Sequence, residues 1–363
     1  MHVMRSRWLR WAVGIALTAV LVACPNSKTP SQPPRPSESA TISSTGPPPL
    51  MTSITLPFDP MSLTYSAATN KLYVVGLEGG PPHFKSFAVG LSAPTSPIER
   101  LDTSIDNVAK DIVVNDKLGR GYALTIPGDI NVFRTDTDTL VSTGQKPSCS
   151  LEVLAIRLET GTLYGGGNSD KGECLVLFNS DGRIVRENVV APPSRNKNMM
   201  VQRIAVDSAS GDVIYTDPYS VGRADQNLVE TWRMPVNGQA EDLGFEPKTN
   251  TVYVTIGDFP IISPTRISVV DGRTGKQREE FSGPAWTSEF AATGDGRLFV
   301  AFFNSNDLYV LSDGSSTLTK FASLGDIPGS SPSDSRYLAV DTIGHQRFVS
   351  PDGYGHQILV YRY

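Results

Sequence analysis

Charged side chains recur at a fixed distance before seven regularly spaced aromatic residues of this 363-residue chain. The position about twelve residues ahead of each aromatic residue is charged in five cases of seven, the set being Met61, Lys110, Glu152, Arg203, Glu241, Thr287 and Arg336. Asp111, Asp242 and Trp286 stand directly beside three of these positions. If the positions converge, their mixed charges suit a polar or zwitterionic ligand. The alternative is that the charges pair with one another around a solvated rim.

The same positions give little support to catalysis. Asp111, Glu152 and Asp242 supply carboxylates of the kind that bind Ca²⁺, but three basic residues of the set would lie close by and repel a cation. The histidines share no spacing with a nucleophile. We therefore expect no catalytic residue, no metal and no cofactor, and we take as candidate ligand-binding residues Lys110, Asp111, Glu152, Arg203, Glu241, Asp242, Trp286 and Arg336.

Cys149 and Cys174 are the two cysteines that follow Cys24. Outside the cytoplasm such a pair can be oxidised. Each precedes a strand that we expect to start at the same end of one four-stranded unit, so bent loops could bring the two Cα atoms within the roughly 7 Å that a disulfide allows. We predict this disulfide. The alternative is two unpaired thiols, which are inert if buried.

The elements that position these residues are predicted by an internal repeat. A turn rich in Gly, Asn or Asp is followed by an apolar residue, an aromatic residue and usually a Val. The aromatic residues are Tyr73, Tyr122, Tyr164, Tyr215, Tyr253, Phe299 and Phe348, and they lie 38 to 51 residues apart. Their average spacing is close to the length of a four-stranded propeller blade. Seven repeats of this length predict seven blades.

Each repeat shows the same order of short strands, for example 111–114, 121–124 and 130–133 in the second repeat. The last repeat ends after its third strand, whereas 51–56 is a strand-like segment ahead of the first repeat. We therefore predict an all-β, seven-bladed β-propeller with four-stranded blades, whose last blade is closed by an N-terminal strand. A two-domain sandwich would not repeat one order of elements seven times.

The N-terminal residues predict export. Three arginines precede an apolar run that is too short for a membrane span and ends before Cys24. Leu21-Val22-Ala23-Cys24 resembles a bacterial lipobox, which implies lipidation of Cys24; a plain secretory signal is the alternative. We expect a signal peptide at 1–23, a disordered Pro/Ser-rich tether at 24–49 and the propeller at 50–363. Pro25 favours the outer membrane or cell surface over the inner membrane.

Composition excludes one class of partner. The formal net charge is -5 and the basic residues are scattered, so the chain lacks the basic patch that nucleic-acid binding requires. We expect a monomeric domain that contacts the membrane only through the lipid on Cys24.

The repeat resembles the YVTN type of β-propeller, as in Tyr73-Val74-Val75-Gly76 and Tyr253-Val254-Thr255-Ile256. The resemblance covers roughly 310 residues and implies an extracytoplasmic module that binds a protein, a glycan or a small polar ligand. Two alternatives stay open, a propeller lactonase or hydrolase and a structural subunit of an envelope assembly. The two differ because catalysis needs a convergent acid–base or metal set, whereas a structural subunit needs an exposed apolar patch.

Overall fold

The computed structural model describes strands through most of the expected propeller region. The chain divides into two units, Met1–Arg35 and Pro36–Tyr363, and all described residues belong to the second. Cys24 and the predicted signal peptide lie outside them, and no helix among them is long and apolar enough to cross a membrane. The described residues are 43–44, 50–56, 59–77, 83–88, 109–125, 128–191, 200–257, 265–284, 286–303, 307–323, 337–340, 346–350 and 357–362.

The described strands form seven sheets, numbered in chain order and given from the innermost strand outward. Sheet 1 has β3 (Asp59–Ser66), β4 (Lys71–Leu77) and β5 (His83–Ala88); sheet 2 has β6 (Ala109–Asn115), β7 (Arg120–Thr125), β8 (Ile130–Arg134) and β9 (Leu140–Thr143). Sheet 3 has β10 (Ser150–Arg157), β11 (Thr162–Ser169), β12 (Gly172–Phe178) and β13 (Ile184–Ala191); sheet 4 has β14 (Arg203–Val206), β15 (Val213–Asp217), β16 (Ser220–Ala224) and β17 (Glu230–Pro235).

Sheet 5 has β18 (Gln239–Glu246), β19 (Thr251–Gly257), β20 (Arg266–Asp271) and β21 (Gln277–Ser282). Sheet 6 has β22 (Trp286–Ala292), β23 (Arg297–Phe303), β24 (Asp307–Ser312), β25 (Thr319–Ser323) and the short β1 (Ser43–Ser44). Sheet 7 has β26 (Tyr337–Val340), β27 (Gln346–Ser350), β28 (Gln357–Arg362) and β2 (Leu50–Thr55).

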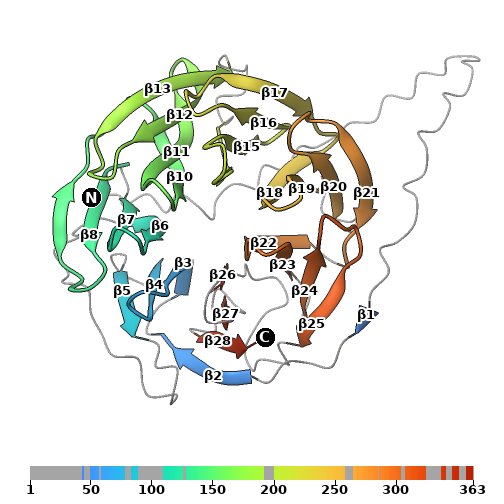
Figure 1. Ribbon diagram of the computed structural model, residues 1–363, viewed down its shortest axis with the longest axis horizontal. Coiled ribbons are helices and arrows are strands. Elements are labelled where there is room, and N and C mark those ends of the chain that lie inside the picture. The colour runs from blue at the N-terminus through green and yellow to red at the C-terminus, as the bar shows by residue number, and fades with distance from the viewer. Residues whose placement is uncertain are drawn as a thin grey trace, which may run out of the picture. The chain divides into compact units, whose positions relative to one another are not determined.

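The sheets are arranged as in a β-propeller with four-stranded antiparallel blades (Figure 1). Each innermost strand contacts the innermost strand of the next sheet, and β26 contacts β3. Buried side chains form a hydrophobic cluster at every junction between neighbouring sheets. The core therefore lies between the sheets, where their apolar faces pack against one another.

In the six sheets where its side chain is described, the repeated aromatic residue is buried in the second strand, and its hydroxyl group explains why Tyr is favoured there. Tyr73, Tyr122 and Tyr253 donate hydrogen bonds of 2.9, 2.9 and 3.0 Å to backbone carbonyls between the third and fourth strands of the next sheet. A buried hydroxyl needs such a partner. The motif thus supplies both apolar packing and a polar tie between neighbouring sheets.

The expected closure by an N-terminal strand is confirmed, because β2 pairs with β28 in antiparallel register from Leu50–Tyr361 to Thr55–Gln357. Within the segment expected to be a tether, two residues are described. Ser43 and Ser44 form β1, which pairs in parallel with Thr319 and Lys320 on the outer edge of β25. An open edge offers unpaired backbone groups to any extended segment, which is why even a Ser-rich stretch can be held there.

Candidate functional site

A β-bulge recurs in the innermost strands and places the residues predicted to bind a ligand. These residues lie where the innermost strands begin; we call this end of the ring the channel mouth and the residues the mouth residues. The register shifts at the same point in β3, β6, β10, β18 and β22, where an extra residue separates two ladder partners. The extra residues are Met61, Lys110, Glu152, Glu241 and Ser288. A bulge redirects side chains and bends the strand. The residues that follow these bulges occupy equivalent positions, and three of them are the carboxylates Asp111, Asp242 and Glu289.

Asp111 joins three sheets. Its carboxylate accepts a 2.8 Å hydrogen bond from the Ser62 hydroxyl of sheet 1 and a 2.7 Å bond from the Leu154 amide of sheet 3. The amide of Ile112 adds a third bond of 2.9 Å. Burial raises the pKa of Asp111, and these hydrogen bonds oppose the rise because they stabilise the charged form.

Glu289 repeats this arrangement between sheets 6 and 7. Its carboxylate accepts a 2.8 Å hydrogen bond from the Leu338 amide, which holds the same place in β26 that Leu154 holds in β10. Burial raises the pKa of Glu289 to about 8, and the negative charge of Asp242 adds to the rise. The Glu289 side chain is therefore mostly protonated at neutral pH.

Asp242 is the third carboxylate, and it faces a cation. Its Oδ1 lies 3.0 Å from Nε of Arg203, whose half-exposed side chain comes from sheet 4. Burial raises the pKa of Asp242 to about 6, while Arg203 and the amides of Leu243 and Phe290 lower it. Phe290 again occupies the position equivalent to Leu154 and Leu338. One device, a carboxylate facing the amide of the next innermost strand, thus recurs in sheets 2, 5 and 6.

These groups form one electrostatic cluster near the centre of the ring. Arg203 lowers the pKa of Asp111, Asp242 and Glu289, so its guanidinium acts on all three carboxylates. Glu241, which lies against Gly257, has its pKa raised to about 7 by burial and by the charge of Asp242. Among the described residues, no group of three or more His, Cys, Asp or Glu side chains is placed to hold a metal ion.

The predicted mouth residues are brought together in pairs. Lys110 and Glu152 form an ion pair of 3.1 Å between sheets 2 and 3, and Arg203 and Asp242 form another between sheets 4 and 5. The side chain of Trp286 and all of Arg336 lie outside the described residues. Glu289 was missed, because counting twelve residues back from Phe299 reaches Thr287. Ladder register, with Glu289 paired to the second residue after the aromatic, is the signal that identifies it.

A second charged cluster, between sheets 3 and 4, has no counterpart in the sequence-based predictions. Arg233 lies 2.8 Å from Asp217 and 3.3 Å from Glu173, and both carboxylates are buried. Its guanidinium also lies over the ring of Tyr215, 5.5 Å from the centroid. Burial and the charge of Asp217 raise the pKa of Glu173 to about 7. The cluster holds two sheets together across residues distant in sequence.

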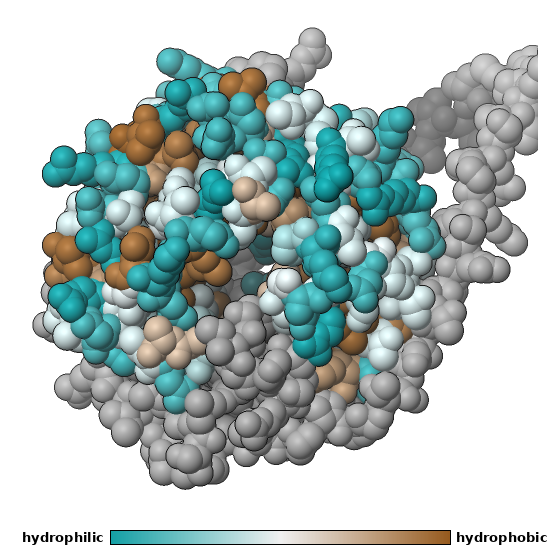
Figure 2. All heavy atoms as spheres, in the orientation of Figure 1, coloured by the Kyte–Doolittle hydropathy of each residue, from teal (hydrophilic) through white to brown (hydrophobic). Residues whose placement is uncertain are grey.

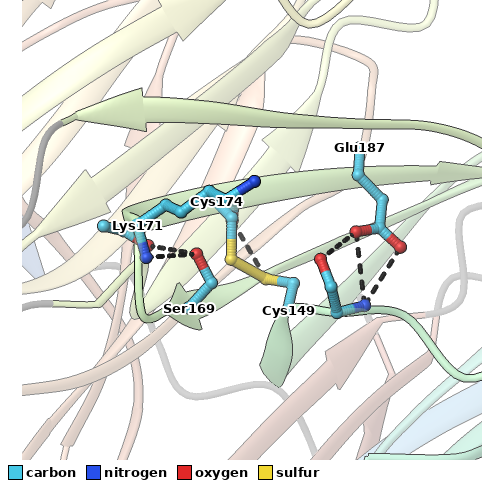
Figure 3. Close-up of a disulfide and its surroundings, with 7 residues drawn as sticks. Cys149, Ser169, Lys171, Cys174 and Glu187 are labelled. Atoms are coloured by element: carbon cyan, nitrogen blue, oxygen red, sulfur yellow. Dashed lines mark hydrogen bonds between the residues drawn. A yellow bond between two sulfur atoms is a disulfide. The ribbon is translucent and has the colours of Figure 1, made fainter.

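The predicted disulfide between Cys149 and Cys174 is confirmed, with Cα atoms 6.2 Å apart (Figure 3). Cys149 directly precedes β10 as expected, whereas Cys174 lies inside β12 rather than before it. Beside the bond, Ser148 donates to the Glu187 carboxylate of β13 through its backbone amide, at 3.1 and 3.2 Å, and through its hydroxyl. The segment that enters sheet 3 is thereby fastened to the two outer strands of that sheet.

Exposed apolar side chains gather in one sector of the molecule. Among the described residues, every large hydrophobic side chain that is exposed belongs to sheets 2, 3 or 4: Leu118, Leu140, Val141, Leu158, Val185, Val189, Tyr219 and Val229. Figure 2 shows such residues at the left and the top, the sides on which Figure 1 places these sheets. Sheet 5, described almost in full, contributes none.

Topology places most of these side chains at one end of the sheets. First and third strands begin at the channel mouth, so the turns that follow them, and the starts of the outer strands, lie at the opposite end. Six of the exposed residues have such positions, and we name them the apolar flank: Leu118, Leu140, Val141, Leu158, Val185 and Val229. Asn115 of sheet 2 donates to the Leu158 carbonyl of sheet 3 at 3.1 Å, so the turns of these two sheets are in contact.

Comparison with known proteins supports the fold alone. No protein-family model matches the sequence, and no curated protein is similar enough to count as a relative. Many solved chains have a similar structure. One belongs to a crystal structure of the mitotic checkpoint complex: it has a TM-score of 0.68 and 13% sequence identity, with 97% of this chain and 99% of that chain covered.

Proposed function

We propose that this chain is an exported, lipid-anchored, seven-bladed β-propeller that serves as an interaction module, with a protein partner docking on the apolar flank. The observation that carries the proposal is that, among the described side chains, the exposed large hydrophobic ones all belong to three neighbouring sheets. Soluble monomeric domains rarely keep contiguous apolar surface exposed, so such a surface marks an interface. The similar propeller in a solved multiprotein complex is consistent with this use of the fold.

Several features support the seven blades and the location outside the cytoplasm. Seven sheets, with innermost strands in contact from each to the next, correspond to one blade for each sequence repeat. The Cys149–Cys174 disulfide is typical of an oxidising compartment. The lipobox-like segment before Cys24 and the Pro/Ser-rich tether supply the anchor in this proposal.

A ligand or a hydrolysis reaction at the channel mouth has weaker support. The charged residues there form ion pairs between neighbouring sheets, and the carboxylates of Asp111 and Glu289 accept backbone amides. Groups engaged in this way hold the ring closed, and a ligand would have to displace their partners. A permanent structural subunit would use the same apolar flank, and stable co-purification with one partner would distinguish it from a transient binding module.

Site-specific photo-crosslinking of the full chain, in the cells that make it, tests the proposal. A benzoylphenylalanine at Leu158 or Val229 should yield one discrete crosslinked protein. Lys248 and Arg273 serve as matched controls, since they are exposed turn residues at the same end of sheet 5. Equal products from both pairs of positions, or none from the flank, would contradict the proposal. Labelling with an alkyne fatty acid, lost on Cys24→Ala, tests the anchor separately.

A further inference from the structure

The outer edge of sheet 3 is a long strand with an open side. β13 (Ile184–Ala191) has eight residues, and β12 is its only neighbour among the described strands. The ladder between β13 and β12 has a register shift near each end, and the pairing between the two shifts, at 186–189, is regular. In that stretch every second residue directs its backbone N–H and C=O away from β12. Such groups can pair with an added strand.

The chain itself shows that an outer edge of this propeller accepts a strand. β1 lies on the free side of β25, the outer strand of sheet 6, through the pairs Ser43–Thr319 and Ser44–Lys320. β25 has a register shift of its own in the ladder with β24, and β1 pairs with the part ahead of that shift. β13 and β25 are thus both outer strands with a register shift in their ladders. Of the two, only β25 has a strand on its outer edge among the described residues.

The side chains of β13 define what the added strand should carry. Arg186 and Asn188 face sheet 4, where they donate to the carbonyls of Asn227 at 3.3 Å and Leu228 at 2.6 Å. Glu187 and Val189 face the other way, since alternate residues of a strand point to opposite sides. Val185 is 60% exposed and Val189 is 37% exposed, and Arg183 and Arg186 are exposed as well. One face of the edge thus carries Val189 beside Glu187, whose carboxylate accepts hydrogen bonds from Ser148, and the other face carries Asn188 beside the exposed, basic Arg186.

We propose that β13 binds an extended segment of a partner protein by strand addition, with aliphatic residues alternating with acidic ones. The aliphatic side chains would pack beside Val189, and the acidic side chains would lie beside Arg186. A second copy of β13 fits less well, because it would bring the same exposed arginines, Arg183 and Arg186, to the interface. The inference rests on the proposed function, since it names the kind of partner that docks beside the apolar flank.

The test is the binding of a fluorescent peptide, Thr-Val-Glu-Val-Glu-Val-Thr with blocked ends, to the full chain, measured by polarisation. Val189→Lys should weaken binding at least about tenfold. Gln277→Lys places the same side chain at an exposed position of β21, the outer strand of sheet 5 and outside the apolar flank, and should leave binding unchanged. A peptide N-methylated at alternate residues keeps its side chains and loses its backbone donors, so it should not bind. Arg186→Glu should reverse the preference to the peptide with lysines in place of its glutamates.

Each result decides the inference. Binding that survives N-methylation or Val189→Lys would overturn it, and so would an absence of binding up to about 1 mM peptide. Flank crosslinks obtained together with a negative peptide result would retain the proposed function and exclude strand addition at β13. Specific peptide binding without flank crosslinks would support strand addition at β13 and exclude docking on the apolar flank.

Discussion

The inner and outer edges of the sheets have the same kind of unpaired backbone groups, but different structural elements satisfy them. At the inner edge, carboxylates of one sheet accept amides of the next, as Asp111 does from Leu154 and Glu289 from Leu338. At the outer edge, β25 is covered by β1, while β13 has no partner on its outer side among the described strands and lies next to exposed valines. Buried polar groups thus tie neighbouring sheets together at the inner edge, whereas the proposed recognition surface lies at the periphery. The comparison leads to four predictions.

The largest effect should follow loss of the disulfide, which fastens the inner entry of sheet 3 to its third strand. The bond spans 25 positions of the chain, and closing a loop of that size stabilises a fold by roughly 3 kcal/mol. Cys149→Ala/Cys174→Ala should lower the free energy of unfolding by that amount in urea titrations. The wild-type chain with reductant should lose a similar amount, and a change below about 1 kcal/mol would contradict the prediction.

Breaking one inner tie should cost somewhat less. Asp111→Ala leaves the Ser62 hydroxyl and the Leu154 amide without their acceptor, which should destabilise the chain by about 2 kcal/mol. Asp111→Asn keeps an acceptor oxygen and should lose less. Urea unfolding measures both variants. Equal stabilities of the Ala variant and the wild type would show that the inner carboxylates do not hold the ring together.

The buried carboxylates of the inner strands, together with Glu173 of β12, should also make the stability depend on pH. Burial raises the pKa of Asp242 to about 6, of Glu241 to about 7 and of Glu289 to about 8. Between pH 5 and 8.5 the folded chain therefore binds more protons than the unfolded chain, and stability falls as pH rises through this window. The Tm should be higher at pH 5.5 than at pH 8.5. Glu289→Gln should flatten this slope, and a Tm that rises with pH would refute the assignment.

The smallest effect on stability is expected at the outer edge. Val185→Lys changes a side chain that is 60% exposed, so its free energy of unfolding should shift by less than about 0.5 kcal/mol. The same substitution should abolish the flank crosslink from Val229, because a lysine disfavours both apolar docking and strand pairing. Loss of stability comparable to that of Asp111→Ala would mean that the outer edge is structural after all.

The fold was predictable because its signals are local and repeated. Turn residues followed by an aromatic and a Val mark the second strand of each sheet, and the segment ahead of the first repeat revealed the partner of β28. The pairing of Cys149 with Cys174 followed from counting strand directions. These inferences need only strand order, which a sequence shows directly.

The candidate site was harder to predict from the sequence, because the positions of its side chains depend on strand register. The bulge at Lys110 determines that Asp111 is the residue that accepts the amide of the next sheet, and a shorter interval before Phe299 concealed Glu289. The β1–β25 pairing joins residues about 276 positions apart through backbone groups alone, so no side-chain pattern announces it. The valines of β13 are typical of any β-strand, so their exposure cannot be predicted from the sequence before the outer face of sheet 3 is known.

The pairing of β2 with β28 also determines how the molecule would carry a mechanical load. A pull on the N-terminal segment enters the ring through the ladder that runs from Leu50–Tyr361 to Thr55–Gln357, after the two-residue contact of β1 has given way. Because this ladder joins the two ends of the folded chain, its rupture would leave the first and last repeats held together by the contact of β3 with β26 and by the buried side chains between their sheets. Resistance to force is then set by the rate at which these few hydrogen bonds and the junction of sheets 7 and 1 open.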